Sequence, residues 1–185
     1  LIKTAAQMGY FINQMESGVT FEGKYIKLAN DLDLSNYRWT LNNTSASFNG
    51  TFDGGCYTLT ISNTLFNKVD TSATVQKLNL NLSDNFEGYC GLTNTNCGLI
   101  QLVCVRGNIP PEGGTTRSRA GLLVGDNYSG TVKYCSAIGN ASAKGNDVSS
   151  YAGMVAYLGD PYSVYYTPEE YLDMQESTSG TYVGI

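Results

Sequence analysis

Polar and apolar residues alternate in short runs along much of the chain, a pattern that predicts β-strands with one buried face. Residues 26–34 show this alternation around a small kink, with apolar positions at Ile26, Leu28, Leu32 and Leu34. Residues 48–61 repeat the pattern around a sharp corner at Asp53-Gly54-Gly55. After this corner we expect three side chains to face inward, those of Tyr57, Leu59 and Ile61.

From Leu65 onward the pattern repeats at intervals of 26, 30 and 32 residues. Four similar pairs start the units: Leu65-Phe66, Gly91-Leu92, Gly121-Leu122 and Gly153-Met154. A second apolar run follows the first three pairs, at residues 75–80, 100–105 and 132–137. One such coil cannot bury its inward face alone, so neighbouring coils stack. We therefore predict an all-β fold, a right-handed parallel β-helix (solenoid), with a β-sandwich as the alternative.

Two segments are predicted to be helical. Residues 4–17 carry apolar residues at helical spacing between a capping Thr4 and a terminating Gly18. Residues 168–174 follow Thr167, a typical N-cap. The chain then divides into an N-terminal capping helix (1–20), a β-helix with repeats (21–160), and a C-terminal cap or the start of a next module, helical or irregular (161–185).

Composition excludes several classes of function. The 185 residues include 11 Lys and Arg, 16 Asp and Glu, and no His, for a net charge of −5. The basic residues are scattered, which argues against nucleic acid as a partner. Without His, a Ser-His-Asp or Cys-His centre cannot be assembled. No run approaches the ~18 apolar residues of a membrane helix, so we expect no membrane insertion within this segment.

Five cysteines without a CxxC pair argue against a zinc site, and no metal or cofactor is expected. Cys97, Cys104 and Cys135 lie in apolar runs and are expected to be free and buried. A disulfide between Cys90 and Cys97 is the alternative. Calcium-binding loops of the Asp-rich type are also missing.

Clustered carboxylates are the remaining route to catalysis, because β-helix enzymes cleave polysaccharides with acidic residues. Asp31 and Asp33 are two residues apart in a predicted strand, so they point to the same side about 6 to 7 Å apart. Asp53 at the glycine corner is a third candidate. Outward positions of a strand are commonly polar, and we assign no catalytic residue.

Aromatic residues give a stronger hint of binding. Four tyrosines of the C-terminal segment are candidate ligand-binding residues because flat aromatic faces stack on sugar rings or anchor a protein: Tyr162, Tyr165, Tyr166 and Tyr171. Sealing an exposed apolar end is their alternative role. Trp39 is expected to pack in the core, and the loop at residues 108–119 is a second place for binding.

Several of these segments together resemble one family: residues 21–34, Trp39, 48–55, 120–125 and 152–156. They resemble the GLUG-motif repeat proteins, which are right-handed β-helical regions of bacterial surface proteins, also found in immunoglobulin A1 peptidases. The resemblance covers about residues 4–157. Two units depart from the motif, because Ala156 and the unit at Cys90 lack its closing glycine. The resemblance implies a secreted or cell-surface location and carries over no catalytic residue.

The expected function is a non-catalytic module of the bacterial cell surface, acting as an adhesin, binding or spacer segment. Its expected partners are a host glycan, a host or cell-surface protein, and neighbouring modules of a longer chain. The chain opens at Leu1 without a leader, which favours a fragment of a larger surface protein. The alternatives are a β-helix enzyme acting on polysaccharides and an accessory region of a surface peptidase.

Overall fold

The structure is a computed structural model that describes residues 1–41, 43–110, 119–142, 151–158 and 179–183. In this part of the chain one helix, α1 (Ala5–Glu16), precedes thirteen strands. The strands are β1 (Tyr25–Lys27), β2 (Leu32–Asp33), β3 (Thr51–Asp53), β4 (Thr58–Ile61), β5 (Phe66–Val69), β6 (Thr74–Leu82), β7 (Thr93–Asn96), β8 (Leu99–Arg106), β9 (Arg119–Asn127), β10 (Thr131–Lys133), β11 (Ser136–Ser142), β12 (Tyr151–Leu158) and β13 (Ser179–Val183).

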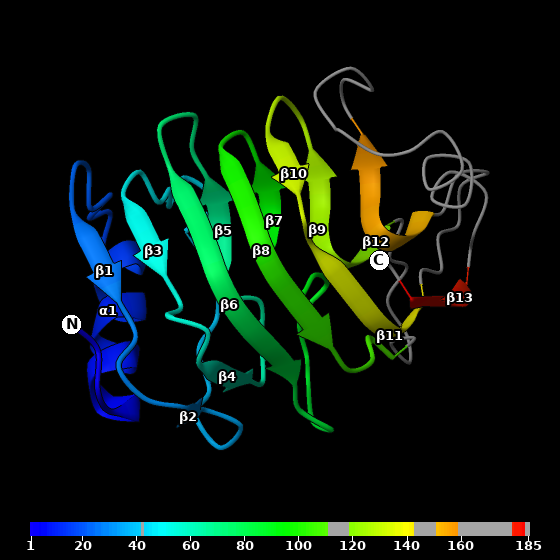
Figure 1. The fold of residues 1–185 in the computed structure, drawn as a ribbon, viewed down its shortest axis with the longest axis horizontal. Coiled ribbons are helices and arrows are strands. Elements are labelled where there is room, and N and C mark those ends of the chain that lie inside the picture. The colour runs from blue at the N-terminus through cyan, green and yellow to red at the C-terminus, as the bar shows by residue number, and fades with distance from the viewer. Residues whose placement is uncertain (42, 111–118, 143–150, 159–178, 184–185) are drawn as a thin grey trace.

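Within the described residues the strands form two sheets. Nine strands make the larger sheet, whose main path runs β1-β3-β6-β8-β11-β13, while β2, β4 and β10 pair beside it. Figure 1 shows β1, β3, β6, β8 and β11 succeeding one another along the long axis of the molecule. The smaller sheet has the order β12-β9-β7-β5. All pairs are parallel except β11 with β13, so the fold is predominantly β and built on parallel sheets.

The register of the larger sheet stacks like residues on like. Val75 pairs with Ile100, and Ile100 pairs with Val132, as the repeat of the second apolar run predicts. Leu80, Val105 and Ala137 form a second aligned column. Both columns are almost fully buried. Inward alternation therefore fixes the register of this sheet, because a shift of one residue would turn every apolar side chain outward.

In the smaller sheet the partners are offset by one residue from the repeat in the sequence. Sequence similarity pairs Phe66 with Leu92, but Phe66 lies opposite Thr93, and Thr93 lies opposite Val124. The register shifts again between Gly153 and Val155 of β12. A Cβ atom on Gly91 would collide with the carbonyl oxygen of Leu122. Glycine at position 91 therefore lets the two backbones approach closely, beside the offset pairing.

Helix α1 covers one end of the core. Thr4 caps it by accepting a hydrogen bond from the backbone N–H of Gln7, as the predicted capping pair requires. Its buried face consists of Met8, Phe11, Ile12 and Met15. The ring of Phe11 lies 5.6 Å from that of Phe52 on β3 and 6.3 Å from that of Phe66 on β5. The helix thus joins both sheets at the blue end of the chain in Figure 1.

The corner after β3 confirms one prediction and corrects another. Gly55 has φ +60° and Cys56 has φ +65°, so the chain turns sharply where Asp53-Gly54-Gly55 predicts a corner. Leu59 and Ile61 are buried as expected, but Tyr57 is 37% exposed. Tyr57 still belongs to the turn, because its backbone N–H donates to the carbonyl of Gly54 and β4 begins only at Thr58. The inward positions of this segment therefore begin at Leu59.

A second line of corners crosses the larger sheet. Lys77, Leu102 and Tyr134 have φ values of +53°, +55° and +55°. They are aligned, because the residues just before them pair across β6, β8 and β10. None of the three is Gly or Asn, the residues that tolerate this conformation at least cost. All three side chains are exposed, and they form a row on the outer surface that we call the corner ridge.

Candidate functional site

The predicted ligand-binding tyrosines lie outside the described residues. This applies to Tyr162, Tyr165, Tyr166 and Tyr171, to the predicted helix at 168–174 and to most of the loop at 108–119. Trp39 is described: it is partly buried against the core, and its indole Nε1 donates a hydrogen bond of 2.9 Å to the carbonyl of Thr64. This agrees with the core-packing role expected for Trp39.

Asp31 and Asp33 are both exposed, at and beside the short strand β2. Each carboxylate accepts a hydrogen bond from a backbone N–H group. Asp31 Oδ1 lies 2.7 Å from the nitrogen of Thr58, and Asp33 Oδ1 lies 2.8 Å from that of Ser35. The bond from Ser35 holds the pKa of Asp33 below its ordinary value. Asp33 therefore anchors a local turn, and Asp31 ties its segment to the start of β4.

Asp53 lies in a hydrogen-bonded row on the first half of the larger sheet. Its carboxylate accepts hydrogen bonds from the hydroxyl of Tyr25, the backbone N–H of Gly55 and the amide of Gln76. Gln101 Nε2 on β8 donates in turn to Gln76 Oε1 at 3.0 Å. Register places Lys27 and Lys133 at the two ends of this row. Polar contacts thus run across four adjacent strands.

Ionisation of Asp53 follows from these contacts. Burial raises its pKa, since only 3% of the residue is exposed, but the hydrogen bonds from Tyr25, Gly55 and Gln76 outweigh burial and bring the pKa below its ordinary value. The hydrogen bond between Tyr25 and Asp53 raises the pKa of Tyr25. A glycosidase acid needs a raised pKa to hold its proton near neutral pH. Asp33 and Asp53 have the opposite shift and remain ionised.

A polar groove at the end of β4, β6 and β8 was not anticipated from the sequence. Its volume is about 530 Å³, and its lining is formed by Ser35, Thr60, Asn81, Leu82, Ser83, Asp84, Asn85, Arg106 and Gly107. Ser83 Oγ donates to Asn85 Oδ1 at 2.7 Å, and Asn85 Nδ2 donates to the carbonyl of Ser35 at 3.1 Å. The available signal in the sequence was a polar residue directly after each of two apolar runs, Asn81 and Arg106.

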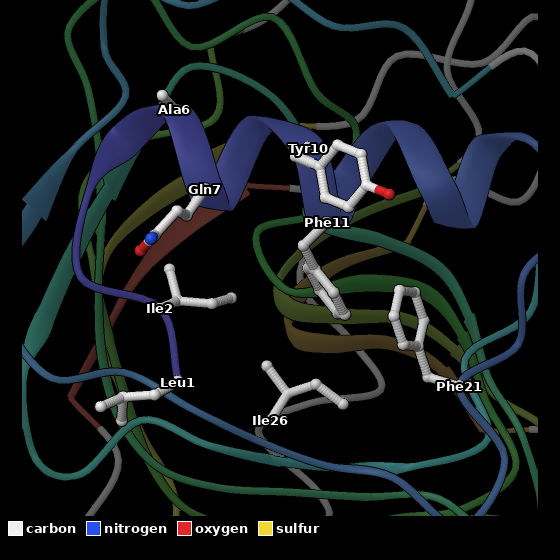
Figure 2. Close-up of a pocket in the computed structure, with 8 residues that line it drawn as sticks. All are labelled: Leu1, Ile2, Ala6, Gln7, Tyr10, Phe11, Phe21 and Ile26. Carbon is white, nitrogen blue, oxygen red and sulfur yellow. The ribbon is translucent and has the colours of Figure 1, made fainter.

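An apolar cleft lies beneath α1, with a volume of about 430 Å³. It is lined by Leu1, Ile2, Ala6, Gln7, Tyr10, Phe11, Phe21 and Ile26. Figure 2 shows Ile2, Phe11 and Ile26 extending into the same space below the helix. Gln7 Oε1 already accepts a hydrogen bond from the backbone N–H of Lys3. The cleft therefore offers apolar contact and few groups that would orient a polar ligand.

All five cysteines are free thiols, so Cys90 and Cys97 are not joined. Cys135 is buried as expected, whereas Cys97 and Cys104 are only partly buried. Burial raises the pKa of the Cys135 thiol to about 11, which keeps it protonated and unreactive. Among the described residues, no three His, Cys, Asp or Glu side chains gather as metal ligands would. The same part of the chain contains no helix with the length and hydropathy of a membrane span.

A comparison with protein-family models, curated proteins and solved structures finds no match for this chain.

Proposed function

We propose that the chain is a right-handed parallel β-helix that acts as a non-catalytic module of the bacterial cell surface, an adhesin, binding or spacer segment for a host glycan or protein. The parallel register supports the solenoid. Ile26, Phe52, Val75, Ile100 and Val132 are successive partners, 23 to 32 residues apart. Residues 21–160 would form the solenoid, 1–20 its cap, and 161–185 a second cap or the start of another module.

The observation that carries the non-catalytic role is the use of the three candidate aspartates. Asp31, Asp33 and Asp53 each accept a backbone N–H, from Thr58, Ser35 and Gly55 respectively. In each case the carboxylate is engaged in holding backbone, and the lowered pKa values of Asp33 and Asp53 are the opposite of what a glycosidase acid requires. The GLUG resemblance supports the same function and a secreted or cell-surface location. Neighbouring modules of a longer chain would be further partners.

A reducing-sugar assay tests this proposal. The protein is incubated with pectic and host polysaccharides beside a buffer control and beside the double variant Asp31→Asn with Asp33→Asn. We expect no sugar release above the buffer control from either protein. Release by the unchanged protein that disappears in the double variant would overturn the non-catalytic role. Asp53→Asn is assayed in parallel, because loss of release in that variant alone would assign the activity to Asp53.

A further inference from the structure

We infer that the outer face of β4, β6, β8 and β11 binds a neutral oligosaccharide, with the polar groove as the main site of contact. This inference rests on the proposed binding role of the module and deepens it by naming a surface and a ligand class. The corner ridge forms one edge of this face, and the polar groove lies along the opposite edge.

Strand register assembles the face. Thr60, Asn81 and Arg106 are direct partners on three adjacent strands. A second row, formed by Thr58, Asn79, Cys104 and Ser136, lies between them and the corner ridge. From Lys77 to Asn81 the face measures about 13 Å along β6, and from β4 to β11 about 14 Å across. An extended ligand of several sugar units is the match for such a surface.

Three groups in the groove retain their full hydrogen-bonding capacity. In the described part of the chain, the side chains of Thr60, Asn81 and Arg106 take part in no hydrogen bond or ion pair. The strands hold their backbones in place, so little ordering of the main chain is needed on binding. Asn85, by contrast, is fixed by Ser83 and by the carbonyl of Ser35. The groove thus combines fixed and available polar groups.

The chemistry of the lining fits sugar hydroxyls. A hydroxyl both donates and accepts hydrogen bonds, and the groove offers amides and hydroxyls that do the same. Arg106 adds a planar donor fork and Asp84 an acceptor, and the two are not paired with each other. These two opposite charges leave the lining without net charge. An uncharged polyhydroxyl ligand suits such a site better than a phosphate or a strongly acidic chain.

The corner ridge supplies the apolar contact that sugar rings require. Tyr134 is 78% exposed and Leu102 is 49% exposed, side by side with Lys77. Their left-handed backbone is strained for residues other than Gly and Asn, so these exposed positions are kept at some loss of stability. Tyr faces stack well on the C–H surfaces of sugars. Strain and exposure coincide at the margin of the face that we assign to the ligand.

The experiment is a calorimetric titration of the full chain with hexaoses of glucose, xylose, mannose and N-acetylglucosamine, and with polygalacturonate as the acidic probe. We expect binding of at least one neutral hexaose that changes little between low and high salt. Asn81→Ala and Arg106→Ala should each weaken it about tenfold, because each removes hydrogen bonds to the ligand. Arg106→Lys should weaken it less, since the charge remains and the planar fork is lost.

Matched controls are Asn13→Ala on the exposed side of α1 and Arg38→Ala, which lies outside the groove lining and pairs with Glu87. Neither should change the affinity. Equal binding by all variants would overturn the groove as the site, and salt-sensitive binding of polygalacturonate alone would overturn the neutral ligand. Binding of no sugar would overturn this inference and leave the non-catalytic role standing, whereas turnover of a hexaose would overturn that role itself.

Discussion

The two sheets bury different chemistry on their inner faces. In the larger sheet the buried columns are aliphatic and aromatic, from Ile26 and Phe52 to Val132. In the smaller sheet Thr93, Asn96 and Asn127 are fully buried among apolar neighbours. Asn96 Nδ2 donates to Asn127 Oδ1 at 2.7 Å, and Asn127 Nδ2 donates to the carbonyl of Gly130 at 2.9 Å. One sheet is set by apolar alternation and the other also by specific hydrogen bonds.

This difference teaches that register is specified in two ways in one molecule. Apolar columns penalise a shift by one residue through the loss of burial. A buried amide penalises it through the loss of a hydrogen bond, since an unpaired buried polar group costs about 1–3 kcal/mol. The first mechanism is visible as a pattern in the sequence. The second depends on which strands become neighbours.

Phe52→Ala should have the largest effect, because Phe52 lies where the apolar cores of the two sheets meet. Its ring is fully buried and lies 5.7 Å from that of Phe66 on the smaller sheet. We expect the free energy of unfolding to fall by about 4 kcal/mol, measured by chemical denaturation. Phe21→Ala, at a partly buried ring beside the same cluster, is the control and should cost clearly less. Equal losses would mean that the junction is not the centre of the core.

Asn96→Ala tests the hydrogen-bonded sheet. The variant removes the donor to Asn127 and the acceptor for the backbone N–H of Gly98, which lies 3.1 Å from Asn96 Oδ1. We expect a loss of about 3 kcal/mol in the free energy of unfolding. Asn94→Ala is the matched control, because partly buried Asn94 makes a single bond of 3.0 Å to Asn67 and should cost about 1 kcal/mol. An unchanged free energy of unfolding in Asn96→Ala would show that the hydrogen bond between Asn96 and Asn127 has no part in stability.

Asp53→Asn tests the hydrogen-bonded row of the larger sheet and the pH dependence of the stability that this row provides. The folded pKa of Asp53 is below the unfolded value, so its stabilisation is present at neutral pH and is lost as the pH falls through the folded pKa. The variant should be less stable by about 2 kcal/mol at pH 7. The difference should shrink below about pH 4 in thermal unfolding followed by circular dichroism. A difference independent of pH would contradict a charge-dependent role.

Leu102→Gly should have the smallest effect on stability, and a favourable one. Glycine relieves the left-handed strain at φ +55°, and Leu102 is half exposed, so little burial is lost. We expect a gain of about 0.5–1 kcal/mol from denaturant unfolding. Leu99→Gly in the same strand, without a positive φ, should destabilise instead. Loss of stability in both variants would mean that packing at the corner ridge outweighs its strain.

The larger sheet was largely predictable from the sequence because its signal is local. Alternation at residues 75–80, 100–105 and 132–137 identified both the strands and the partners that the register aligns. The helix was equally readable, since Thr4 and Gln7 form its cap within a few residues. In each case the residues that carry the information are close to the structure they determine.

The smaller sheet and the groove were less predictable for physical reasons. A pattern based on hydrophobicity places polar Thr93 and Asn96 on the outside, yet both are buried. Thr93 donates to the carbonyl of Thr95 in its own strand, and Asn96 donates to Asn127 on the neighbouring strand β9. The corner ridge has no Gly or Asn, the residue types from which a left-handed backbone is predicted. The groove collects residues from 35 to 107, and only the strand register brings these distant segments together.

Unequal spacing between register partners has a consequence for how such chains diversify. Val75 and Ile100 are 25 residues apart, whereas Ile100 and Val132 are 32 apart, yet both pairs occupy the same column. The column stays aligned although the second interval is longer than the first. The length of chain between two register partners can thus vary while the column stays aligned. An engineer could graft a foreign epitope into that interval and expect the frame around it to stay unchanged.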